Sequence, residues 1–195
     1  SLTRTQQDEF AVESHRRAAR AWAEGKFADE VVAVPVPQRK GDPVFVRQDE
    51  GVRADATLET LGALKPIMKG GVVTAANASQ QNDAAAACLV VAEDQLEKLG
   101  LEPMGWFVGW AAAGVEPSRM GIGPVPAVER LFQRTGLKWK DIDLVELNEA
   151  FAPQVLAVLK GWNWNDADKL NVNGSGISLG HPIGATGGRI LANLM

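Results

Sequence analysis

The stretch 171–188, NVNGSGISLGHPIGATGG, constrains this chain more than any other part of its 195 residues. Its many glycines let the backbone turn sharply and approach another group closely, which a Cβ atom would prevent. A histidine, His181, lies within it between Gly180 and Pro182. A helical pattern begins near Gly187, so we expect the free N–H groups of a helix N-terminus to face the same space as the imidazole.

His181 fits two interpretations. Histidine is the side chain that most readily exchanges protons or donates a hydrogen bond near neutral pH, so a glycine-rich turn around it is typical of an active site. A histidine that only closes a loop and packs there accounts for the same residues about equally well. The residue types alone leave both interpretations open.

A second motif, NEAFA over 148–152, places Asn148 directly after the apolar run 144–147. Turns from strand to helix at the carboxyl ends of sheet strands are where α/β proteins build their sites. Asparagine is also a favoured helix N-cap, and taken alone Asn148 is best interpreted as the cap of a helix over 149–160. The two roles are compatible if its backbone starts the helix while its amide faces a pocket.

Candidate strands and helices alternate along the chain. We expect helices over 3–24, 58–64, 83–98, 127–134, 149–160 and from 187 onward, and strands over 31–36, 44–46, 72–75, 104–113 and 143–147. Thr3 and Gln6 have the spacing of a capping box at the start of the first helix. The alternation predicts the α/β class with layered sheets.

Several residues that carry chemistry elsewhere have ordinary structural interpretations here. Cys88 lies in the apolar run 84–91, which favours a buried structural thiol over a catalytic one. His15 stands beside Arg16 and Arg17 and is interpreted as part of a solvated helix face. Met120, Phe151, Trp106 and Trp110 are assigned to the core by default.

Composition narrows the function classes. The net charge of −4 argues against a general nucleic-acid binder, which usually presents a basic face. The single cysteine excludes an internal disulfide and fits a reducing compartment, so we expect a cytoplasmic protein. No apolar run approaches the ~20 residues of a membrane span, and no signal peptide is visible.

Phosphate-binding motifs are absent from the sequence. It has no GxxxxGK[ST] run, and the spacing of Gly174, Gly176 and Gly180 does not match GxGxxG. A nucleotide triphosphatase or a Rossmann dehydrogenase is therefore disfavoured. A start at Ser1 without methionine and an end at Met195 within a helical pattern lead us to expect a piece of a longer sequence.

Four blocks of the chain, in order, resemble the thiolase family: Gly70–Ala87, Arg119–Leu131, Glu146–Gln154 and Asn171–Arg189. NEAF together with GHPIGATG differs from the two histidines of decarboxylating ketoacyl synthases and from the HDCF motif of sterol-carrier-type relatives. The resemblance implies the five-layered αβαβα thiolase fold. On that pattern 1–79 is the loop region, 80–103 closes the N-terminal half, and 104–195 is most of the C-terminal half.

The resemblance also implies a reaction. Thiolases cleave a 3-ketoacyl-CoA by thiolysis or run the reverse Claisen condensation, with a cysteine nucleophile in a ping-pong cycle. The matching His181 contributes to an oxyanion hole with a water held by Asn148, and it helps to activate the nucleophile. Coenzyme A is a substrate, and neither a permanently bound cofactor nor a metal is implied. Homodimers or homotetramers are the expected assemblies.

Further residues match the substrate-binding positions of the family. Ser79 resembles the serine that contacts the pantetheine arm of coenzyme A. Arg53 resembles the basic residue beside its adenine nucleotide, and Thr60 stands where a serine often does. Met120 and Phe151 resemble the pocket wall.

The chain departs from the family pattern in one respect. The two cysteine blocks of the family would lie before Ser1 and after Met195, and Cys88 matches neither of them. We therefore expect the chain alone to be inactive, with bare apolar surface on the helix over 83–98. The alternative is a non-catalytic CoA-binding or subunit-association chain. Asn148 and His181 together favour the enzyme, because a pure binder has no need of an oxyanion pair.

Overall fold

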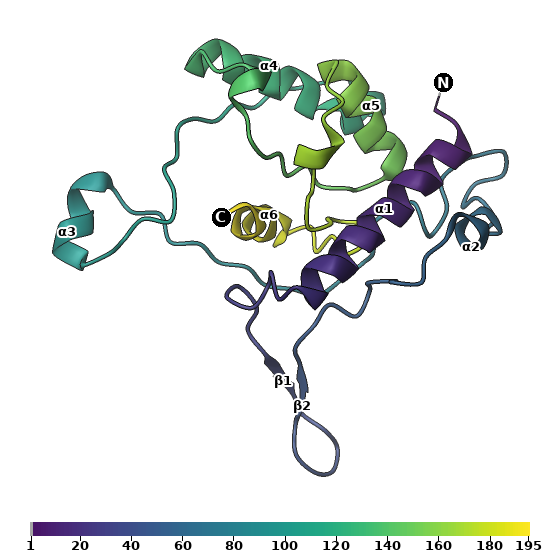
Figure 1. Cartoon of the computed structure of the whole chain (residues 1–195), viewed down its shortest axis with the longest axis horizontal. Coiled ribbons are helices and arrows are strands. Elements are labelled where there is room, and N and C mark those ends of the chain that lie inside the picture. Colours follow the sequence, from purple (N-terminus) through teal and green to yellow (C-terminus); the bar gives the residue numbers. More distant parts are fainter. Residues whose placement is uncertain (1) are drawn as a thin grey trace.

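A computed structural model describes residues 2–195, and its longest helix, α1 (Arg4–Ala23), crosses the middle of the molecule (Figure 1). The predicted capping box is present, since the Thr3 side chain accepts from the backbone N–H of Gln6 and the Gln6 side chain accepts from that of Thr3. These two bonds satisfy donors that the first turn cannot pair. The helix ends before Gly25, which has a φ of 70°.

The remaining elements are short. The other helices are α2 (Leu58–Gly62), α3 (Leu96–Leu99), α4 (Pro124–Thr135), α5 (Ala152–Trp162) and α6 (Thr186–Leu194), with 3-10 turns η1 (Glu93–Gln95), η2 (Pro117–Ile122), η3 (Trp139–Asp141) and η4 (Ala167–Lys169). Strands β1 (Val34–Val36) and β2 (Val44–Val46) pair antiparallel, with Val34 opposite Val46. This hairpin projects away from the helices in Figure 1 and is exposed along its whole length.

Three apolar clusters make up the core, and two of them join buried residues of α1 to the C-terminal part of the chain. Their buried members are Ala11, Leu61, Ala152 and Ile177 in one, Ala18, Ala21, Phe27 and Leu179 in another, and Leu147, Val155, Val158 and Leu170 in the third. α1 supplies small side chains to two of these clusters. The loop around 177–179 is therefore packed directly against α1, and this packing positions the segment that precedes His181.

The helix predicted over 83–98 is wrong for most of its length. Residues 83–92 are extended, and only η1 and α3 follow, ending at Gly100 in the left-handed conformation. A Cβ added to Gly188 of α6 would lie 3.0 Å from the Cβ of Ala86, so this extended run passes close to α6. Tertiary context thus overrides the high helix propensity of alanine.

The extended conformation also exposes the segment's apolar residues. Leu89 and Val90 are 77% and 83% exposed, and the thiol of Cys88 is exposed as well. The expectation of a buried structural cysteine is therefore wrong, because it depended on the 83–98 helix.

Three of the predicted strands do not form ladders among residues 2–195. Residues 72–75 carry no strand, 104–113 are extended but unpaired, and 143–147 contribute only the parallel bridge from Val145 to Leu170. Trp106 and Trp110 on the second segment are exposed, contrary to their default assignment to the core. The residues of these segments are apolar enough for buried strands, but in this part of the chain no neighbouring strand covers them.

His15 is buried and is not on a solvated helix face as predicted. Its side chain is 5% exposed, and its Nδ1 atom accepts a hydrogen bond of 3.1 Å from the backbone N–H of Arg53. Burial first, and the Arg53 charge second, lower the pKa of His15 from 6.5 to about 4. The ring is therefore neutral at pH 7 and joins α1 to the 51–56 segment.

Candidate active site

The loop that carries His181 is built on glycines that have no room for a side chain. Gly180 has a φ of 110°, and a Cβ there would lie 2.3 Å from Oδ1 of Asn82. A Cβ on Gly176 would lie 2.8 Å from Oδ1 of Asn148. The glycines are thus needed both for backbone conformation and for the close approach of two asparagine side chains.

The segment 80–82 fixes the loop in place. The backbone N–H of His181 faces two acceptors, the Gln80 carbonyl at 3.3 Å and Oδ1 of Asn82 at 3.2 Å. The Nε2 atom of Gln80 donates to the carbonyls of Ile177 at 2.8 Å and Ser178 at 3.3 Å. Residues almost one hundred positions apart are thereby held together, and the His181 backbone cannot move independently of the 80–82 segment.

The imidazole of His181 is partly buried and has one hydrogen-bond partner among residues 2–195. Its Nδ1 atom lies 2.8 Å from the hydroxyl oxygen of Thr186, at the start of α6. Burial first, and the charge of Arg189 second, lower the pKa of His181 below its ordinary value. A neutral ring can exchange a proton at its other nitrogen, Nε2.

Asn148 is not the helix N-cap that its position in the sequence predicts. Phe151 occupies the N-cap position of α5, which begins at Ala152. The Asn148 side chain is half-buried, and its Oδ1 atom accepts from Nη2 of Arg189 at 3.5 Å. Because a guanidinium only donates, this contact identifies the oxygen end of the amide and leaves Nδ2 available to another group.

The neighbouring Glu149 ties three segments together. Its side chain is fully buried and accepts hydrogen bonds from the Ser14 hydroxyl at 2.6 Å, the Ile177 N–H at 3.2 Å and Nδ2 of Asn171 at 3.1 Å. Burial raises the pKa of Glu149, while these donors oppose the shift. The carboxyl group thus joins α1 to both the Asn148 segment and the His181 loop.

Glu146 and Arg189 form a buried pair beside the site. Nη1 of Arg189 lies 3.9 Å from Oε2 of Glu146, whose side chain is 5% exposed. Burial is the main cause of the pKa of Glu146 being raised to about 8. The charge of Arg189 opposes this shift, and the charges of Glu149 and Glu30 add to it. Burial also lowers the pKa of Arg189. The Arg189 guanidinium acts on both Glu146 and Glu149, and it contacts Asn148.

The structure brings two of the predicted coenzyme A contacts to the same region. The N–H of Ser79 donates to the Ala150 carbonyl at 2.9 Å, so Ser79 lies beside the NEAF motif. Nε2 of Gln80 also donates to the Gly51 carbonyl at 3.0 Å, which draws the segment of Arg53 toward the His181 loop. The Arg53 side chain is exposed.

The other three predicted contacts are all exposed. The Thr60 hydroxyl lies on the first turn of α2 and takes part in its capping box with Thr57. Met120, in η2, is 76% exposed, and Phe151 is 43% exposed and bridges to Ala78. Their default assignment to the core is therefore wrong, and both apolar side chains are exposed.

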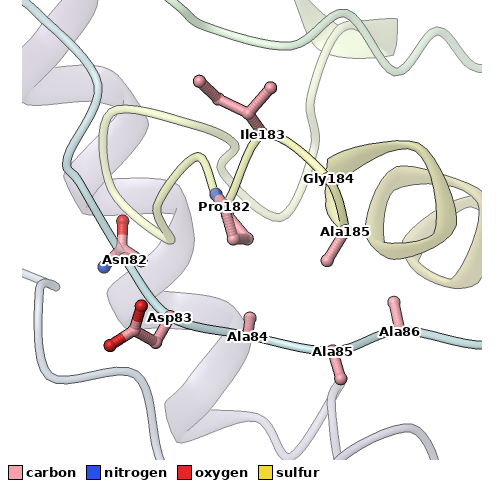
Figure 2. Close-up of a pocket in the computed structure, with 9 residues that line it drawn as sticks. All are labelled: Asn82, Asp83, Ala84, Ala85, Ala86, Pro182, Ile183, Gly184 and Ala185. Atoms are coloured by element: carbon pink, nitrogen blue, oxygen red, sulfur yellow. The ribbon is translucent and has the colours of Figure 1, made fainter.

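A pocket of about 430 Å³ lies beside the His181 loop. Figure 2 shows its two walls, the extended run 82–86 on one side and the loop 182–185 on the other. The walls consist mainly of small side chains, including those of Ala84, Ala85 and Ala86. No group of three or more potential metal ligands is present among residues 2–195. No helix in the same range is long and apolar enough to cross a membrane.

Sequence reasoning did not identify Gln80, Thr186, Arg189 or the role of Glu149. Gln80, Glu149 and Arg189 act through hydrogen bonds to residues that are distant in the sequence. Thr186 bonds to the imidazole of His181, whose orientation the sequence does not indicate. The one available signal was spacing, because Thr186 follows His181 by five residues at the start of a helix. Side chains near a helix N-terminus commonly bond to groups of the preceding loop.

Comparison with known proteins gives consistent matches. Family models described as "Thiolase, N-terminal domain" and "Thiolase, C-terminal domain" match residues 1–94 and 101–195. The acetyl-CoA acetyltransferase of Cupriavidus necator is 51% identical over the whole chain, which covers 49% of that protein. A probable acetyl-CoA acyltransferase of Staphylococcus epidermidis is 49% identical, with the same coverage.

Solved structures agree with these matches. The crystal structure of the Bacillus anthracis acetyl-CoA acetyltransferase has a TM-score of 0.95 at 45% identity, over 99% of this chain and 49% of that one. Human mitochondrial 3-ketoacyl-CoA thiolase has a TM-score of 0.90 at 41% identity, with the same coverage. The chain spans about half the length of these relatives. The predicted α/β class is confirmed, and the chain belongs to the thiolase family.

Proposed function

We propose that the protein containing this chain is a CoA-dependent acyltransferase that performs thiolysis of a 3-ketoacyl-CoA or the reverse Claisen condensation. The observation that carries the proposal is the pairing of two held side chains on adjoining loops. Thr186 holds the ring of His181, and Arg189 holds the amide of Asn148. The names of the relatives, which include acetyl-CoA acetyltransferase and 3-ketoacyl-CoA thiolase, support the same class.

The reaction requires two services that these residues can supply. A thiol must lose its proton before it attacks a thioester carbonyl, and the carbonyl oxygen then becomes an oxyanion that needs hydrogen-bond donors. The neutral His181 ring can accept the proton at Nε2 and then donate it in a hydrogen bond to the oxyanion. Nδ2 of Asn148 can hold a water molecule as the second donor. Removing one such donor typically costs about 10²- to 10³-fold in rate.

The nucleophile is not assigned to Cys88. That thiol lies on the extended run beyond the pocket and matches neither family cysteine. We propose that a cysteine from outside this sequence forms the acyl-enzyme in a ping-pong cycle and that a second cysteine handles the other proton. The 195-residue chain would then bind substrate without turning it over.

The substrate contacts follow from the exposed residues around the loops. Ser79 is assigned to the pantetheine arm, because its backbone is bonded beside the NEAF motif. Arg53 is assigned to the adenine nucleotide, whose phosphates its exposed guanidinium can pair. Thr60 is a weaker member of this set, because its hydroxyl is engaged in a helix cap. Met120 and Phe151 form the wall that faces the acyl chain.

The wider organisation stays a prediction within the same proposal. Residues 1–79 form the loop region, 80–103 close the N-terminal thiolase half, and 104–195 make most of the C-terminal half. The complete protein is expected to form homodimers or homotetramers in the cytoplasm and to need no permanently bound cofactor.

The test uses the complete protein that carries this sequence and follows loss of a 3-ketoacyl-CoA when coenzyme A is added. His181→Ala is expected to lower kcat by about 10²- to 10³-fold. Its affinity for coenzyme A, measured by calorimetry, should stay within a few-fold. Full turnover in His181→Ala would contradict the assigned role. Coenzyme A binding without thiolysis in the unsubstituted protein would favour the alternative, a non-catalytic CoA-binding or subunit-association chain.

A further inference from the structure

The hydroxyl of Thr186 is buried between two polar groups of the His181 loop. Its oxygen lies 2.8 Å from Nδ1 of His181 and 3.1 Å from the carbonyl oxygen of Pro182. Thr186 is 5% exposed and opens α6, so the backbone holds its position. Its backbone N–H also donates to the Pro182 carbonyl, at 2.9 Å. The side chain therefore has two neighbours and a single proton to distribute between them.

The chemistry of the two neighbours decides where that proton lies. A carbonyl can only accept, so any hydrogen between the Thr186 and Pro182 oxygens must come from the threonine hydroxyl. Without it, two oxygens would face each other at 3.1 Å with only lone pairs between them. The hydroxyl therefore donates to Pro182, and the oxygen is left as an acceptor. The remaining contact, 2.8 Å from Nδ1, is satisfied when His181 carries its proton on Nδ1.

We propose that Thr186 is a positioning residue that keeps His181 protonated on Nδ1, so that proton exchange during the reaction takes place at Nε2 alone. This inference rests on the proposed function for its catalytic meaning. Free histidine favours the opposite neutral tautomer, with its proton on Nε2, so the loop selects the less common form.

In the proposed step, a single proton moves from the attacking thiol to Nε2 of His181. Nε2 begins with a lone pair and takes the proton of the attacking thiol, so an S–H bond breaks and an N–H bond forms. The products are a thiolate and an imidazolium that still holds its Nδ1–H bond to Thr186. The new Nε2–H can donate to the oxyanion and later return its proton. In the neutral ring and in the cation alike, Nδ1 is protonated, so Thr186 does not have to rearrange.

A hydroxyl in this place differs from the carboxylate that often orients a catalytic histidine. The carboxylate stabilises an imidazolium, whereas a hydroxyl is neutral and fixes the tautomer with little effect on the charge. Burial first, and the positive charge of Arg189 second, disfavour the cation of His181 and lower its pKa. The imidazolium is thus expected to be short-lived, which favours return of the proton to the oxyanion or leaving group.

The first experiment reads the tautomer directly. The chain has two histidines, His15 and His181, so its ¹⁵N-histidine nuclear magnetic resonance spectrum is simple to assign. His15 is an internal reference, because its Nδ1 accepts from Arg53 N–H and its proton must lie on Nε2. That signal also reports folding, because folded His15, with a pKa of about 4, stays neutral at pH 5 to 6, where a histidine with the ordinary pKa of 6.5 takes up a proton. His181 is expected to show the Nδ1–H form.

Two substitutions at Thr186 separate the hydroxyl from the shape of the side chain. Thr186→Val keeps the branched shape and removes the hydroxyl, and it is expected to move His181 toward the Nε2–H form. Thr186→Ser keeps the hydroxyl and is expected to restore the Nδ1–H form. An Nε2–H ring in the unsubstituted chain, or a ring unchanged in Thr186→Val, would overturn the proposal. Neither result depends on turnover, so failure of the proposed function is recognised separately.

A second arm measures catalysis in the complete protein and does not require the 195-residue chain to fold alone. Thr186→Val is expected to lower kcat about 10- to 100-fold, a part of the ~10² to 10⁴ that positioned proton transfer contributes. KM for the CoA substrate should change no more than a few-fold, and Thr186→Ser should recover most of the lost turnover. A loss that serine does not rescue, or one confined to KM, counts against a positioning role.

Discussion

Nη2 of Arg189 lies 3.5 Å from Oδ1 of Asn148 and 3.3 Å from Oγ of Ser175. Arg189 and Thr186 stand three residues apart, within the first turn of α6. One turn of helix thus contacts both candidate catalytic side chains, Asn148 through the guanidinium and His181 through the hydroxyl. The relative placement of the two groups therefore depends on how α6 is seated.

Arg189→Lys tests this placement. Lysine keeps the positive charge but lacks the planar fork that reaches Asn148 and Ser175 together. We expect kcat of the complete protein to fall by about tenfold or more while KM stays within a few-fold, because small misplacements of a catalytic group are costly. The matched control is Arg134→Lys, an exposed arginine of α4. Equal kcat in both variants would show that Arg189 does not position Asn148.

Ser79→Ala tests the assignment to the pantetheine arm. A contact made equally in the ground state and the transition state affects KM and leaves kcat unchanged. We therefore expect KM for coenzyme A substrates to rise several-fold at nearly constant kcat, measured by steady-state kinetics. Ser118→Ala, at an exposed serine in η2, is the control. A fall in kcat at constant KM would argue for a role in the chemistry instead.

Glu149→Gln tests the buried carboxyl that joins α1 to the loops. Both carboxylate oxygens of Glu149 accept hydrogen bonds. Glutamine has only one oxygen, so its NH₂ group would face another donor, either the Ile177 N–H or Nδ2 of Asn171. We expect the free energy of unfolding to drop by about 1–3 kcal/mol, the usual cost of leaving a buried donor unpaired. Urea denaturation measures this drop. Glu129→Gln, on the exposed side of α4, should change stability by much less.

His15 makes stability depend on pH in the acid range. Its folded pKa, about 4, lies below the ordinary 6.5, so the unfolded chain takes up the proton first as pH falls. Stability is therefore complete above pH 6.5 and is lost progressively between pH 6.5 and 4. His15→Asn retains an acceptor for Arg53 N–H without titrating in this window, and its urea midpoint should vary less with pH there. An unchanged pH profile would mean that His15 is not the titrating group.

Glu146 acts in the opposite direction. Its folded pKa, about 8, lies above the ordinary 4.5, so the folded chain holds the proton more tightly. Its contribution is fully present below pH 4.5 and is lost as pH rises toward 8, at no more than about 1.4 kcal/mol per pH unit. In Glu146→Gln the midpoint of denaturation should vary less with pH between pH 5 and 8. A steeper fall in that variant would contradict the raised pKa.

Elements with strong local signals were predictable from the sequence. The first helix has a capping box at Thr3 and Gln6 and a glycine after its last turn, and it forms within one residue of its predicted bounds. α4 and α6 also form where helices are predicted over 127–134 and from 187 onward, and α4 begins three residues earlier, at Pro124. For the first helix this information lies within one turn of its own ends.

Elements that depend on distant neighbours were predicted less well. The alanine-rich run after Asp83 is extended because it crosses the His181 loop and α6, and nothing in its own residues indicates that path. Asn148 is not at the cap position, because α5 starts only after Phe151, and its amide contacts Arg189 instead. Motif resemblance predicts that His181 and Asn148 share a site, but no pattern in the sequence indicates the hydrogen bonds of Gln80, Thr186 and Arg189.

The extended runs 84–92 and 104–113 affect how the chain behaves in concentrated solution. Each presents a row of N–H and C=O groups that no strand among residues 2–195 pairs, with large apolar side chains such as Val90 and Trp106 beside them. Unpaired edges of this kind are templates for another polypeptide. At rising concentration, copies of this chain should associate edge to edge unless other polypeptide covers these runs. Light scattering measured as a function of protein concentration would detect this association.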